Sequence, residues 1–105
     1  MRIGRVVGRV TLNRAYDTLV GGRFLIVEVQ DRFALARDVA QPPPAVSIRA
    51  NERLVVYDHL GAGYGELIAF SESREAAMPF YPEKRVPIDA YNAAILDAAV
   101  ITHQM

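Results

Sequence analysis

A glycine-rich segment, Gly61-Ala62-Gly63-Tyr64-Gly65, is the first feature of the sequence that could bind a ligand. Dinucleotide-binding loops have the spacing G-x-G-x-x-G and open a helix whose N-terminus faces the pyrophosphate. Here the spacing is G-x-G-x-G, and strand-like residues follow it. The segment is therefore predicted to be a tight turn, in which glycines supply positive φ angles or let backbones approach closely.

Asp58 and His59 are adjacent, and Ser71 or Ser73 downstream would complete the residue types of a hydrolase triad. Neither serine lies in a G-x-S-x-G elbow, and Ser73 before Arg-Glu-Ala-Ala is typical of a helix N-cap. His59 and His103 lack metal-ligand spacing to each other or to a pair of carboxylates. We expect both histidines to be surface or interface residues.

Two pairs of carboxylates, Glu72 with Glu75 and Asp89 with Asp97, could in principle perform acid–base catalysis. No segment that would form a pocket brackets either pair. The sequence contains no cysteine, so it can form neither a disulfide nor a thiolate metal site. It predicts no catalytic residue, no metal site and no cofactor, and we expect a protein that is not an enzyme.

The composition is that of a single folded domain covering residues 1–105. The chain is 51% hydrophobic and 23% charged, which excludes wholesale disorder. A core this small supplies little net stability, so association with other chains would be a natural supplement. The formal net charge is zero, whereas nucleic-acid binders need a surplus of Lys and Arg to displace counterions from phosphates.

No apolar run has the length of a transmembrane helix or of a signal-peptide core, so we expect no membrane association and a cytoplasmic location. Lys84 is the only lysine among the twelve basic residues, and the others are arginines. A high-GC genome explains this bias most simply. Arginine would also suit bidentate pairing across subunit interfaces.

A period of two predicts a strand at 2–12, and Leu25, Val27 and Val29 form one apolar face of a second strand at 23–30. Short apolar runs predict two more strands at 53–58 and 66–71. Glycines within the first strand suggest a strong bend or a close backbone approach. Ser73 is expected to cap one helical turn that ends at Ala77. Pro42-Pro43-Pro44 predicts a stiff surface loop, with an SH3-type recognition motif as the alternative. By its alanine content alone, the segment 88–101 would be a helix.

Five stretches of the sequence occur together in a characteristic order and spacing. They are Met1–Val10, the apolar run Arg23–Val27, the G-A-G-x-G-E pattern at Gly61–Glu66 before Leu67-Ile68, the turn Ser73–Ala77, and the P-[IV]-D-A pattern at Pro87–Ala90 followed by Ala94–Asp97. In combination they resemble the pentameric vertex proteins of bacterial microcompartments, the family of ethanolamine-utilisation protein N and carboxysome shell protein L. The resemblance covers most of the chain, with departures in the loop at 31–50, at Tyr91-Asn92 and at the short C-terminal end.

The resemblance implies an all-β fold with one small α turn: a five-stranded, OB-like barrel that forms a cyclic homopentamer. It replaces the helix expected at 88–101 by a strand from Ile88 to about Asp97. It implies a structural protein at the vertices of a microcompartment shell in the bacterial cytoplasm, beside hexameric and trimeric shell proteins, with no reaction of its own.

Within this family, Leu54–Asp58 and Asp89–Asp97 are most similar to a branch linked to fucose and rhamnose breakdown. Because glycines let backbones approach, we expect Gly61, Ala62 and Gly63 to lie near the five-fold axis or a neighbouring subunit. The alternative function is an OB-like module that binds single-stranded nucleic acid on aromatic platforms. Candidate platforms are Tyr57, Tyr64, Phe70 and Tyr91, although the zero net charge disfavours this function.

Overall fold

The computed structural model describes residues 1–30 and 52–100. Its strands are β1 (Arg2–Val10), β2 (Arg23–Val29), β3 (Arg53–Asp58), β4 (Leu67–Glu72) and β5 (Ala90–Leu96), and its short helices are η1 (Asp17–Leu19), α2 (Arg74–Ala77) and η2 (Met78–Phe80). No helix in these ranges is long and apolar enough to cross a membrane. The predicted loop at Pro42–Pro44 and His103 lie outside the described residues.

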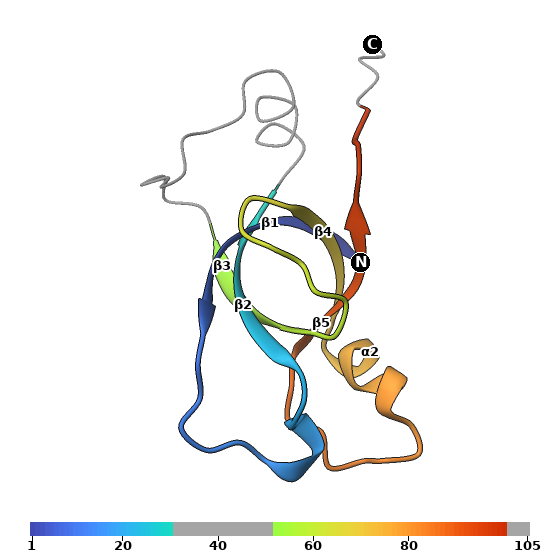
Figure 1. The fold of residues 1–105 in the computed structure, drawn as a ribbon. Helices are drawn as coiled ribbons and strands as arrows, with labels where there is room; N and C mark the ends of the chain where they lie inside the picture. Colours follow the sequence, from blue (N-terminus) through green and yellow to red (C-terminus); the bar gives the residue numbers. More distant parts are fainter. Residues whose placement is uncertain (31–51, 101–105) are drawn as a thin grey trace.

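The strands form one closed barrel with the order β1-β2-β3-β5-β4, and β4 returns to pair with β1 (Figure 1). Four of the neighbouring pairs are antiparallel. The fifth pair, β3 with β5, is parallel and consists of a single bridge between Tyr57 and Tyr91. This arrangement confirms the predicted five-stranded, OB-like barrel with one small α turn.

The barrel interior is filled by alternate side chains of the strands, as the period of two predicted. On β2, Leu25 and Val27 face the interior, while Glu28 on the outer face is covered and forms an ion pair of 3.3 Å with Arg53. A second cluster packs Leu19 and Val86 against Tyr57 at one end of the barrel. The buried residues of the main core are Val6, Leu25, Val27, Val56, Ala62, Ile68, Phe70 and Ala90.

The last strand shows tertiary structure overriding local propensity. The prediction of a helix at 88–101 from alanine content is wrong. The strand β5 occupies Ala90–Leu96, as the family resemblance implied. β5 pairs with β4 from Leu67 opposite Leu96 to Glu72 opposite Ala90. Pairing with β4 closes the barrel, and the backbone hydrogen bonds and core packing formed there outweigh a small difference in propensity.

The expected helical turn is present at Arg74–Ala77, but the predicted role of Ser73 is wrong. The Ser73 side chain makes no capping hydrogen bond. Its backbone adopts φ +57° and its N–H donates to the carbonyl of Asp89 at 2.8 Å. Ser73 therefore redirects the chain from β4 into α2 through its backbone.

At Gly4 in β1, neighbouring atoms come close to the backbone, as the glycines of the first strand led us to expect. A Cβ at this position would overlap Cγ1 of Val27 and lie 3.0 Å from Cε1 of Phe70. The register of β1 against β2 also shifts between Val6 and Gly8, which bends the strand around the barrel. At Gly8, in contrast, the nearest atom to an added Cβ is Cδ1 of Ile26, at an ordinary 3.5 Å.

These two glycines provide a matched test of the packing. Gly4→Ala is expected to lower the free energy of unfolding by about 2 kcal/mol, because the methyl group overpacks a core with stiff neighbours. Gly8→Ala adds the same methyl group to the same strand without a clash and is expected to be close to neutral. Urea denaturation followed by circular dichroism measures both. Equal effects at the two positions would contradict the proposed packing.

Candidate functional site

The predicted glycine turn lies within the loop that joins β3 to β4, residues 59–66, here called the closing loop. In Figure 1 this loop passes across the opening of the barrel. Ala62 is 1% exposed and belongs to the main core with Val6 and Leu25. Gly61 and Gly65 have φ angles of +86° and +85°, which favour glycine. No helix follows, so the closing loop is a cover of the barrel and lacks the geometry of a dinucleotide-binding loop.

The carboxylate of Asp58, at the end of β3, holds the first half of the closing loop. Its side chain is fully buried. Oδ1 accepts hydrogen bonds from the N–H of Leu60 at 3.0 Å and from Nδ2 of Asn92 at 2.8 Å. Oδ2 accepts from the N–H of Gly61 at 3.0 Å and of Ala62 at 3.1 Å. One carboxylate therefore ties β3 to the closing loop and to β5.

Two arginines hold the closing loop from β1 and β2. Nη2 of Arg23 donates to the carbonyl of Ala62 at 3.1 Å and lies 3.4 Å from Oδ2 of Asp58. Nη1 of Arg5 donates to the carbonyl of Gly65 at 2.6 Å. These bonds satisfy loop carbonyls that have no strand partner, so the closing loop is fixed at both ends.

The environment of Asp58 favours its ionised form. Burial on its own would raise the pKa of this carboxyl, but hydrogen bonds from Asn92 and from the N–H groups of Leu60, Ala62 and Gly61 outweigh it, and the pKa is lowered. A group whose pKa is lower in the folded state stabilises the fold above its unfolded pKa. That contribution is lost as the pH falls through the lower, folded pKa.

Asp58 and His59, which were considered for a catalytic triad, both form hydrogen bonds within the fold. The oxygens of Asp58 are occupied by the donors described above, and the ring of His59 forms a hydrogen bond of 2.9 Å with the hydroxyl of Tyr57. Among the carboxylates, Glu72 forms an ion pair of 3.1 Å with Arg2. Over residues 1–30 and 52–100, no group of three or more His, Cys, Asp or Glu side chains could hold a metal ion.

The aromatic residues considered for nucleic-acid binding do not form an exposed platform. Tyr57 and Phe70 are 1% and 0% exposed. Tyr91 is half-buried and stacks on Tyr57 with 6.1 Å between ring centroids. Tyr64 is 56% exposed, but it lies in the closing loop and is not part of this stack. Base stacking needs accessible ring faces, so these positions do not support the nucleic-acid alternative.

The contact between Asp58 and Asn92 is the main feature that sequence reasoning missed. Asp58 enters that reasoning only as a candidate catalytic residue, although an aspartate just before a glycine-rich turn is a typical acceptor of backbone N–H groups. The role of Asn92 depends on a shift of register in β5, where Ala69 pairs with Ala94 but Phe70 pairs with Asn92. Asn92 is completely buried at this bulge. The sequence marks Tyr91-Asn92 as a departure from the family pattern but does not show that Asn92 would face Asp58.

Replacing the central carboxylate tests this network. Asp58→Asn is expected to lower the free energy of unfolding by about 3 kcal/mol, because an amide cannot accept all of the buried hydrogen bonds. The exposed Asp97→Asn is the matched control and is expected to be neutral. Urea denaturation of both variants is the measurement. Wild-type stability should fall as the pH drops below about 4, and this loss should be smaller in Asp58→Asn. An Asp58→Asn variant as stable as Asp97→Asn would contradict the role of the network.

Comparison with known proteins matches residues 1–97 to the family model described as ethanolamine utilisation protein EutN/carboxysome. The carboxysome shell vertex protein CcmL of Gloeobacter violaceus is 31% identical over 104 residues, which cover 99% of this chain and 90% of the relative. The solved structure of CcmL from that organism superposes with a TM-score of 0.70 at 32% identity, covering 96% of this chain and 90% of the other.

More distant structures support the fold alone. The pentameric microcompartment shell protein GrpN of Rhodospirillum rubrum has a TM-score of 0.72 at 24% identity, with 97% and 100% of the two chains covered. EutN of Escherichia coli has a TM-score of 0.71 at 23% identity, with 96% and 89% covered. The family model, the CcmL relative and the closed five-stranded barrel agree, and the chain belongs to the EutN/CcmL family.

Proposed function

We propose that this chain, a microcompartment shell protein of the EutN/CcmL family, assembles into a cyclic homopentamer that occupies the vertices of a polyhedral shell. The observation that carries the proposal is the family match over residues 1–97, together with a relative of 31% identity that is a carboxysome shell vertex protein. GrpN, which shares the fold, is a pentameric microcompartment shell protein. The role is structural, and no residue needs to perform chemistry for it.

The architecture suits a subunit of a barrier. Side chains from all five strands and Ala62 of the closing loop fill the barrel, so one subunit offers no passage along its own axis. A head-to-tail interface forms a ring when its rotation closes, which prevents open filaments. Flat layers of hexagonal tiles cannot enclose a volume, and a five-fold unit supplies the curvature that closes a shell.

The oligomeric state tests the proposal directly. Size exclusion coupled to light scattering is expected to give about five times the 11.6 kDa mass of one chain, because the ring closes at five copies. The measured mass should not change with protein concentration, as long as that concentration is well above the dissociation constant of the ring. A monomer at micromolar concentration would contradict the proposed function.

The partners and the pathway belong to the same proposal. Hexameric and trimeric shell proteins would be the neighbours of the pentamer in a shell within the bacterial cytoplasm. The fucose and rhamnose assignment rests on Leu54–Asp58 and Asp89–Asp97, which form the seam between β3 and β5. The genes that flank the coding sequence test both points: other shell proteins and aldehyde-handling enzymes of that pathway should be encoded there.

We also propose that Gly61 and Gly63 of the closing loop lie near the five-fold axis or a neighbouring subunit. The side chain of Ala62 points into its own barrel, so this residue would take part only through its backbone. Gly63 is the informative position, because the positive φ angles in the loop belong to Gly61 and Gly65. A Cβ at Gly63 would meet only the flexible carboxylate of Glu66, at 3.3 Å.

Gly63→Val is therefore expected to weaken the pentamer while the barrel still folds, because the added side chain would clash with a neighbouring copy. Light scattering gives the assembly state and circular dichroism gives the thermal stability. Gly8→Val, at a strand position where an added Cβ would make ordinary contacts of 3.5 Å or more with Ile26, is the control. A less stable but fully pentameric variant would assign Gly63 a local backbone role only. A stable pentamer would contradict the proposed location.

A further inference from the structure

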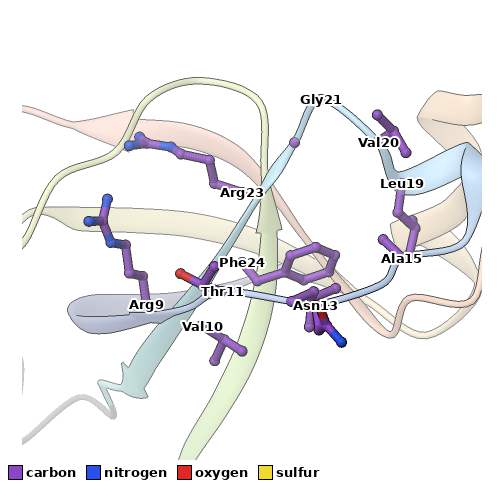
Figure 2. A pocket seen from close by; sticks show the side chains of 12 residues that line it. Arg9, Val10, Thr11, Asn13, Ala15, Leu19, Val20, Gly21, Arg23 and Phe24 are labelled. Carbon is purple, nitrogen blue, oxygen red and sulfur yellow. The ribbon is translucent and has the colours of Figure 1, made fainter.

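A groove lies beside the connection between β1 and β2. Its walls are the end of β1 and the segment that leads through η1 into β2 (Figure 2). Leu19 and Phe24 form part of its apolar lining, and Arg9 and Arg23 lie at one end (Figure 2). Val20, also in the lining, is 71% exposed. The groove has a volume of about 390 Å³, and its lining residues include no carboxylate.

A second apolar feature lies at α2 and η2. Met78 in η2 and Tyr81 just after it are 55% and 74% exposed. They line a shallow hollow of about 460 Å³ together with Ala77 and the charged residues Arg74, Glu83 and Lys84. This surface, formed by Arg74, Ala77, Met78, Tyr81, Glu83 and Lys84, is called the α2 patch here. Adjacent exposed apolar side chains rimmed by charges are typical of a protein interface.

The two features are held apart within one chain. In Figure 1 the connection from β1 to β2 leaves the barrel on one side, and α2 lies on the other. Between them, the hydroxyl of Thr18 donates to the carbonyl of Arg85 at 2.7 Å, which fixes the two connections relative to each other. A cyclic ring requires two different surfaces of this kind, one on each flank of the subunit, because its interface is heterologous.

We propose that the α2 patch of one subunit docks into the β1–β2 groove of the next subunit around the ring. This inference rests on the proposed homopentamer and identifies its two contacting faces. Docking covers Met78 and Tyr81 of one copy and Leu12 and Val20 of the other, the exposed apolar side chains of the two surfaces.

Charge supports the same pairing. Arg9, at the end of the groove, has no ion-pair partner within residues 1–30 and 52–100. Glu75, on the exposed side of α2, likewise has none in the part of the chain that the structure describes. The α2 patch carries both signs of charge, with Arg74 and Lys84 beside Glu83. An Arg9–Glu75 contact would set the register of docking while apolar burial supplies the affinity.

Engineered thiols test this interface, since the natural chain has no cysteine. Differently tagged chains carrying Val20→Cys and Tyr81→Cys are co-expressed, purified through both tags and treated with a short bis-maleimide. The expected product is a covalent dimer that contains both tags. Each variant expressed alone should give no covalent dimer, because a groove thiol then faces an unmodified α2 patch. Val55→Cys paired with Tyr81→Cys is the control, because Val55 is 49% exposed on β3 outside both surfaces.

The outcomes separate this inference from the proposed function. A mixed covalent dimer within particles of pentameric mass would support both. Pentameric mass without the mixed dimer would overturn the docking of these two faces and leave the homopentamer intact. Covalent dimers from either variant alone would show like faces in contact and would also overturn the head-to-tail pairing. A monomeric mass for the unmodified chain would overturn the proposed function and this inference with it.

Discussion

The buried carboxylate of Asp58 is the interaction on which the rest of the barrel depends. An unpaired buried charge is costly, but this one accepts five hydrogen bonds, from Leu60, Gly61, Ala62, Asn92 and Arg23. It acts where the barrel has its weakest backbone pairing, the single parallel bridge between β3 and β5. The carboxylate replaces backbone pairing at that seam and fixes the closing loop over the barrel with the same set of bonds.

The closing loop in turn completes the core. Ala62 fills the barrel opening with a side chain from the turn itself, and the arginine contacts from β1 and β2 satisfy the loop carbonyls. Gly4 removes a side chain where β1, β2 and β4 converge, so the small barrel can close tightly. A core of this size leaves the subunit with modest stability, and assembly into the proposed ring would add buried apolar area that a monomer lacks.

The first four strands could be predicted because each carries an alternation or a short run of apolar side chains, and Leu25 and Val27 on β2 lie on the predicted apolar face. Propensity does not predict β5, because pairing with β4 decides that segment and pairing is a long-range property. The glycine pattern predicts the closing loop as a turn but says nothing of its anchoring. The contact between Asp58 and Asn92 joins residues 34 apart and depends on a bulge.

The polar residues that could have suggested catalysis are engaged in holding the fold. Asp58 binds backbone amides, His59 bonds to Tyr57, and Glu72 pairs with Arg2. In an enzyme such groups would remain free to exchange protons with a substrate. Glu72 does line a hollow together with Glu52 and Asp89, but it is paired with Arg2. Here the barrel interior is packed, and the exposed apolar side chains of the β1–β2 connection and of η2 lie on its outside. A protein that uses its polar groups internally and leaves apolar side chains on two flanks is built to associate, as a shell subunit must.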